Sequence, residues 1–168
     1  MKNLKTIFTI IFCVCYTLIN AQSKDKEQDD YATFYIKDAR ENESDITPYA
    51  IEENAYLVLY KSNDGEEIML SNYWEKSNSQ SFGRIYLITK EGKPETTSEY
   101  KYDLYNFQWS YSNSYDDKKG TAKIRLYLIY KPQGTYFEFT VLPENLDVLV
   151  YKGIMKGDLK VLDAKIYK

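Results

Sequence analysis

The stretch "TAKIRLYLIYKPQGTYFEFTVL", residues 121–142, decides the fold, because apolar and polar side chains alternate on both sides of a central turn. Pro132 and Gly134 mark that turn. Alternate side chains of a strand point to opposite faces, so the pattern predicts a hairpin with one buried and one wet face. The expected buried face carries Ile124, Leu126, Leu128, Tyr130, Phe137, Phe139 and Val141.

Similar short runs, rich in Tyr, Ile, Val and Phe, recur along the chain with turn residues between them. Together with the hairpin they give nine candidate strands, and no convincing amphipathic helix alternates with them. The sequence predicts an all-β fold with antiparallel neighbours, a meander that forms a small barrel or a two-sheet sandwich. The other runs are 31–37, 55–74 (two strands joined by Asn63-Asp64-Gly65), 82–89, 98–112, 145–152 and 158–167.

The run 98–112 changes phase midway. Tyr100, Tyr102 and Leu104 share one face, whereas the next aromatic residues, from Tyr105 onward, occupy the other. A straight strand cannot bury both sets against one core. We therefore expect a long bent strand with a β-bulge at residues 104–106 that returns both halves to the same interior.

The chain begins with the layout of a secretory signal peptide, which we assign to residues 1–21 and exclude from the fold. Lys2 and Lys5 precede an apolar stretch shorter than the ~20 residues of a membrane-spanning helix. Residues 22–30 lack apolar side chains and are expected to form a disordered tether, leaving 31–168 as a single β domain. The predicted protein is secreted, periplasmic or on the cell surface, with no transmembrane segment after signal cleavage.

Composition excludes several kinds of chemistry. Cys13 and Cys15 lie inside the expected leader, and the chain has no histidine. A cysteine-free mature chain without histidine has no thiolate nucleophile, no Ser-His-Asp triad and no His- or Cys-ligated zinc. With 22 basic and 25 acidic residues, nucleic acid is disfavoured as a partner. We expect no cofactor and no metal site.

Carboxylates leave one enzymatic alternative. Asp103, Glu138 and Asp147 lie in expected strands, where a pair could act as acid and base of a glycosidase. We favour the simpler interpretation, in which each is the polar partner in an in/out alternation. The sequence therefore predicts a protein that binds rather than catalyses.

Aromatic content provides the functional hypothesis. Eighteen tyrosines and two tryptophans exceed what a core of this size accommodates easily, because each tyrosine hydroxyl needs a partner or water. Rings at period two are also ordinary core, and that alternative stays open. We predict an aromatic-rich face or pocket that binds an apolar small molecule or a glycan. Its expected residues are Trp74, Tyr86, Tyr105, Phe107, Trp109 and Tyr127.

A second hypothesis is a protein-interaction or cell-envelope assembly component that uses a free sheet edge or an exposed tyrosine face. It requires Tyr56, Val58 and Tyr60 to face solvent together. In size and strand count the chain resembles lipocalin-like barrels. The Gly-x-Trp motif that this family carries near its first strand is absent here, since Trp74 and Trp109 lie elsewhere, so no family residues are transferred.

Overall fold

The computed structural model describes residues 30–91, 101–144 and 147–166. The predicted leader and nearly all of the predicted tether lie outside these ranges, as do the first three positions of the run 98–112. Asp30, the last tether residue, already belongs to the first strand. Neither helix within the described part has the length and apolar character needed to cross a bilayer.

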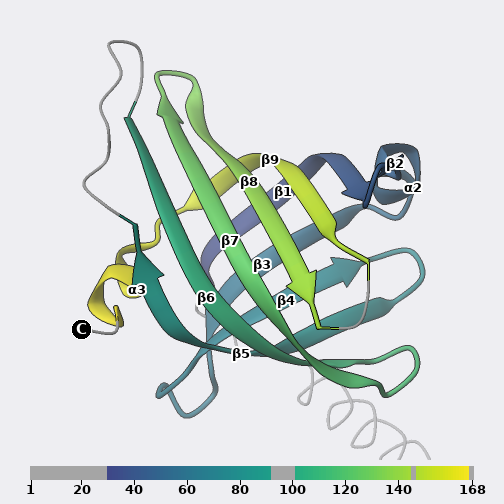
Figure 1. Cartoon of the computed structure of the whole chain (residues 1–168), viewed down its shortest axis with the longest axis horizontal. Helices are drawn as coiled ribbons and strands as arrows, with labels where there is room; N and C mark the ends of the chain where they lie inside the picture. The colour runs from purple at the N-terminus through teal and green to yellow at the C-terminus, as the bar shows by residue number, and fades with distance from the viewer. Residues whose placement is uncertain (1–29, 92–100, 145–146, 167–168) are drawn as a thin grey trace, which may run out of the picture.

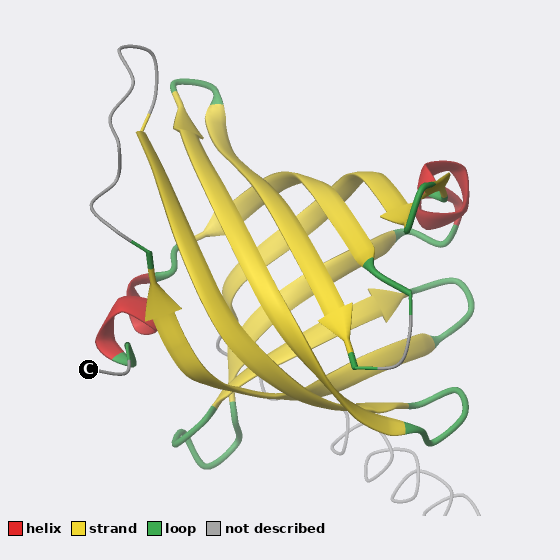
Figure 2. Cartoon of the chain, viewed as in Figure 1, coloured by secondary structure: helices red, strands yellow, loops and turns green. Residues whose placement is uncertain are grey.

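The described residues form a closed antiparallel barrel of eight strands with one short extra strand, as Figure 1 and Figure 2 show. The predicted all-β fold is confirmed, and of the two expected forms it is the barrel. The elements are β1 (Asp30–Glu41), β2 (Ser44–Asp45), α2 (Thr47–Glu52), β3 (Ala55–Lys61), β4 (Ile68–Trp74), β5 (Ser79–Lys90), β6 (Lys101–Asn113), β7 (Lys119–Lys131), β8 (Gly134–Pro143), β9 (Leu149–Gly157) and α3 (Lys160–Ala164).

Every barrel strand pairs with its neighbour in the chain, and β9 returns to pair with β1, which closes the sheet. In such a meander the strands alternately end and begin at the same end of the barrel. The two helices lie at opposite ends in Figure 1, and we call these the α2 end and the α3 end. Residues distant in sequence therefore meet at each end.

The barrel interior is a single apolar core. Phe34 lies between Phe137 and Phe139, with ring centroids 5.1 Å and 5.5 Å away in edge-to-face geometry. Phe107 approaches Phe139 at 6.0 Å. The inward faces predicted for β7 and β8 are confirmed, because Leu126, Leu128 and Phe139 are among the most deeply buried side chains. Local alternation was sufficient to predict them.

The bulge predicted at residues 104–106 is wrong. The pairing of β6 with β7 runs without a register shift from Lys101 to Ser112. The two sets of side chains instead use opposite faces. Tyr105, Phe107 and Trp109 point into the core, as does Asp103, whereas Tyr102 packs outside against Tyr127 and Leu104 does not belong to the core cluster.

The bulge lies in the neighbouring strand. The register of β5 with β6 shifts between Tyr86 and Thr89, and Leu87 has a φ of 51°. The extra residue bends β5 around the barrel, as Figure 1 shows, and leaves both Ile85 and Ile88 buried. A neighbour's bulge therefore provides the bend that the sequence seemed to require of β6.

The C-terminal strand predicted at 158–167 is also wrong. The chain forms helix α3 there, with Leu159 and Leu162 buried against the core. Leu159 and Val161 alternate as in a strand, whereas Leu159 and Leu162 share one side of a helical turn, and so short a run cannot distinguish the two. The ninth strand is instead β2, a two-residue strand elsewhere in the chain that pairs only with the end of β1.

A row of aromatic and aliphatic side chains runs around the outer wall. Every barrel strand except β5 contributes one residue to it. Successive members are cross-strand partners, and Tyr56 stacks on Tyr73 with centroids 5.0 Å apart. Such pairs each stabilise a sheet by about 0.2–1 kcal/mol. Cross-strand pairing on this wall thus accounts for five of the eighteen tyrosines. The row is Tyr102, Ile129, Tyr136, Ile154, Tyr35, Tyr56 and Tyr73.

Candidate functional site

A pocket of about 360 Å³ opens at the α2 end of the barrel. We call it the mouth pocket. Its floor is made of buried side chains, its wall of half-buried ones and its rim of exposed ones. The floor is Asn72, Trp109, Val141 and Tyr151; the wall is Ile46, Trp74, Ser81, Tyr111, Asn113, Pro143 and Leu149; the rim is Glu41, Tyr49 and Asp147.

The meander explains why these residues meet. Strands β1, β4, β6 and β8 end at the α2 end, and β5 and β9 begin there. Trp74 and Ser81 are near neighbours because they flank the β4–β5 turn, while Trp109 arrives from β6. Each of these strands places an inward-facing residue at the α2 end. These side chains leave an open cup at that end of the barrel.

Aromatic rings form the sides of the cup. Tyr49 of α2 stacks on Trp74, with centroids 5.2 Å apart and planes inclined at 29°. Trp109 and Tyr111 form a second tilted pair at 4.8 Å and 34°. These are the two tryptophans of the chain. Flat, stiff ring faces of this kind suit a ring-shaped guest.

The pocket floor contains polar groups that the fold leaves unsatisfied. Trp109 is 3% exposed and its Nε1 has no hydrogen-bond partner among the described residues. Asn72, 6% exposed, donates from Nδ2 to Tyr151 Oη at 3.1 Å, while its Oδ1 is likewise without a partner there. Exchanging the amide atoms of Asn72 would still leave one unpaired. Buried unpaired groups each cost about 1–3 kcal/mol, which a polar guest at the floor could recover.

Tyr151 is held neutral beneath the pocket. Burial raises its pKa to about 12, the hydrogen bond from Asn72 opposes the rise, and the negative charge of Glu41 adds to it. The Glu41 carboxylate at the rim therefore affects the pKa of Tyr151 at the floor.

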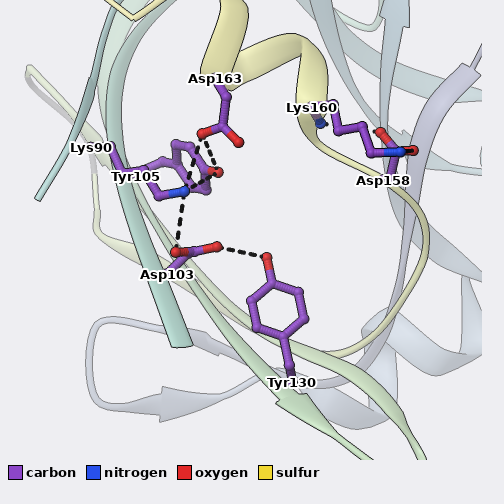
Figure 3. Close-up of polar contacts among 7 residues, drawn as sticks. All are labelled: Lys90, Asp103, Tyr105, Tyr130, Asp158, Lys160 and Asp163. Atoms are coloured by element: carbon purple, nitrogen blue, oxygen red, sulfur yellow. Dashed lines mark hydrogen bonds and ion pairs between the residues drawn. The ribbon is translucent and has the colours of Figure 1, made fainter. Parts of the chain in front are cut away.

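The α3 end contains a different kind of cluster, which we call the α3-end network (Figure 3). Lys90 Nζ lies 3.0 Å from Tyr105 Oη and 3.1 Å from a carboxylate oxygen of both Asp103 and Asp163. Tyr105 Oη donates to Asp163 at 2.9 Å, and Tyr130 Oη donates to Asp103 at 2.9 Å. Every member is paired, so the network fastens α3 across the end of the barrel.

A hollow of about 350 Å³ adjoins this network. Four of its polar side chains, Asp103, Tyr105, Tyr130 and Asp163, already form hydrogen bonds to one another or to Lys90, as Figure 3 shows. A still larger hollow of about 570 Å³ lies on the outer wall over Tyr35, Tyr56 and Tyr73. Neither includes a buried polar atom without a partner among the described residues, and the mouth pocket does. That difference, rather than volume, makes the mouth the candidate site.

The α3-end network predicts a loss of stability at alkaline pH. Burial raises the pKa of Tyr105 to about 12 and that of Tyr130 well above its ordinary value; the pKa of Lys90 also rises, because three hydrogen bonds outweigh its burial. Above about pH 10 the unfolded chain loses these protons first. The free energy of unfolding should fall by about 1.4 kcal/mol per pH unit for each retained proton.

Urea unfolding between about pH 8 and about pH 11 tests this expectation. The Lys90→Met variant should show a shallower dependence over that window. A wild-type free energy of unfolding that stays constant there would contradict the assignment.

The structure divides the six residues expected at the binding site. Trp74 and Trp109 line the mouth pocket, Phe107 lies in the core, and Tyr105 belongs to the α3-end network. Tyr86 and Tyr127 lie on the outer wall, where Tyr86 packs under Arg84 and Tyr127 against Tyr102. The six therefore do not form one face.

The carboxylates considered for a glycosidase are also dispersed. Asp103 lies inside the α3 end and Asp147 at the rim of the opposite end. Glu138 pairs with Lys152 at 2.8 Å on the outer wall. No two of the three are placed to act on one bond.

The trio considered for protein interaction does share the outer face. Val58 and Tyr60, however, are only 6% and 8% exposed, and Tyr60 Oη accepts a hydrogen bond from Ser71 at 3.1 Å. Val58 and Tyr60 therefore offer little exposed surface to a protein partner.

Several mouth-pocket residues were not predicted from the sequence, among them Asn72, Tyr111 and Tyr151. One signal for Asn72 was present, because this polar residue interrupts the inward apolar parity of β4 between Leu70 and Trp74. Asp103 interrupts β6 in the same way.

A comparison with known protein families, curated proteins and solved structures finds no match to this chain.

Proposed function

We propose that this protein is a non-catalytic binding module that takes a small ring-containing molecule in the mouth pocket. The observation that carries the proposal is a cup walled by both tryptophans whose floor holds buried polar groups without partners. An empty core end would be stabilised by filling it with apolar side chains, and here the fold keeps it open. The predicted leader is consistent with action outside the cytoplasm.

Chemistry at the floor of the pocket favours binding over catalysis. The floor offers an N–H donor, an amide and a neutral phenol, and none of these is a base or nucleophile near neutral pH. The ring walls exclude water from a flat guest, and the floor fixes its orientation by hydrogen bonds. This combination supports recognition of a ring that carries at least one polar substituent.

Fluorescence titration provides the test, because both tryptophans line the pocket and report on it alone. A panel of lipids, oligosaccharides and aromatic small molecules is titrated, with excitation at the red edge of the tryptophan band. Ser81 lines the pocket, so Ser81→Leu should fill it and weaken binding by about tenfold or more. The added side chain enters open space, and folding should be unaffected.

The matched control is Ser112→Leu. Ser112 lies between Tyr111 and Asn113, which line the pocket, so its own side chain points to the outer wall. This variant should bind within about twofold of wild type. Equal binding by both variants, or a panel that leaves the tryptophan emission unchanged, would contradict the proposal.

A further inference from the structure

We propose that the guest of the mouth pocket is an organic cation, with its ring between the tryptophans and its ammonium group at the rim beside Glu41 and Asp147. This inference rests on the proposed function and adds the charge class of the ligand. Neutral and anionic rings are the alternatives that it excludes.

The rim carries negative charge without a counter-ion among the residues that the structure describes. Glu41 and Asp147 are the charged groups among the described lining residues, and neither forms an ion pair with any other described residue. Glu41 is the inward-facing end of β1, opposite Leu149 of β9. Two carboxylates at one opening attract a cation and repel an anion.

The rim is held in place by Asn42. Its Nδ2 donates to Asp147 Oδ1 at 2.6 Å, its Oδ1 accepts the backbone N–H of Val148 at 3.0 Å, and its own N–H donates to the Val148 carbonyl at 2.8 Å. Asn42 adopts a φ of 52°, which brings these groups together. The Asp147 carboxylate is thus fixed rather than free to turn into solvent, as a binding site requires.

Ring faces and floor agree with this charge class. Tyr49 and Trp74 near the rim present faces of negative potential, which attract an ammonium group. At the floor, Trp109 Nε1 lacks a hydrogen-bond acceptor, and the Asn72 amide lacks a second hydrogen-bond partner among the described residues. A hydroxyl can serve both, since it accepts and donates. The favoured guest therefore carries an ammonium at one end of a ring and a hydroxyl at the other.

Three probes of one shape test the inference. Tyramine, tyrosol and hydroxyphenylpropionate share a phenol and a short chain, and they end in an ammonium, a neutral hydroxyl and a carboxylate. Calorimetric titration should show tyramine binding about tenfold tighter than tyrosol, with the carboxylate weakest and the tyramine affinity falling as salt rises.

Charge-removing variants complete the test. Glu41→Gln with Asp147→Asn keeps the shape of the rim and should bring the three affinities within about threefold of each other. Glu43→Gln is the matched control, because Glu43 is exposed nearby but does not line the pocket, and it should keep the preference for tyramine.

Two failures can be told apart. If tyrosol or the carboxylate binds wild type as tightly as tyramine, or if only a neutral or anionic member of the broader panel binds with sensitivity to Ser81→Leu, the charge class is overturned and pocket binding stands. If neither the three probes nor the panel binds, both proposals fail.

Discussion

Replacing Lys90 with methionine is expected to lower the free energy of unfolding by about 2–4 kcal/mol. The Lys90 ammonium is the single cation between Asp103 and Asp163 in the α3-end network, and the Asp103 side chain is only 9% exposed. Methionine keeps the apolar stem but leaves the two carboxylates facing each other without a counter-ion. The value lies below the full range for buried pairs because Asp163 is half exposed.

Lys152→Met is the matched control. Lys152 makes an ion pair of similar length, 2.8 Å to Glu138, on the outer wall, where both side chains are more than 40% exposed. Such pairs contribute about 0–1 kcal/mol. Urea unfolding followed by tryptophan fluorescence measures both variants. Equal costs for the two lysines would mean that the α3-end network does not fasten the barrel.

Gly153→Ala should be strongly destabilising, with an expected cost of about 3 kcal/mol or more. A Cβ at Gly153 would lie 2.0 Å from the carbonyl oxygen of Tyr35 and 3.1 Å from the nitrogen of Lys37. Both are backbone atoms of β1, next to its register shift at residues 36–38, so neither can move alone. The two strands approach closely here because the barrel bends, and only glycine permits it.

Gly120→Ala distinguishes this effect from a general cost of adding a methyl to a strand. Its Cβ would meet Tyr111 Oη at 2.7 Å, but that atom is the far end of a side chain facing the open mouth pocket and can swing away. We expect a cost under about 1 kcal/mol. Thermal or urea unfolding of both variants decides the matter, and a Gly153→Ala protein as stable as Gly120→Ala would disprove the close approach.

Most of the barrel could be predicted from local sequence. The alternation in 121–142 depends only on neighbouring residues, and it predicted the inward faces of β7 and β8 correctly. The phase change in β6 is visible in the sequence but does not predict its own cause, because a parity change has two solutions: a bulge, or a strand that uses both faces. The choice depended on the register with β7 and on a bulge in β5, and neither is local to β6.

The candidate site could be predicted only in part. Two of the six expected residues, Trp74 and Trp109, do line one pocket, while Tyr86 and Tyr127 lie on the outer wall. Ring density could not separate these groups, since cross-strand tyrosine pairs stabilise the outside of a sheet as rings fill its inside. Polar residues at inward positions, Asn72 and Asp103, were the better markers of the two barrel ends.

The sequence by itself determined the eight barrel strands, their antiparallel pairing and the absence of imidazole chemistry, since alternation and composition are properties of the chain alone. Tertiary structure decided which strand ends meet, and so placed Glu41 beside Asp147 and Trp74 near Trp109. The physical reason is barrel closure: pairing β9 with β1 fixes register around the whole sheet, and that register determines which side chains share an opening.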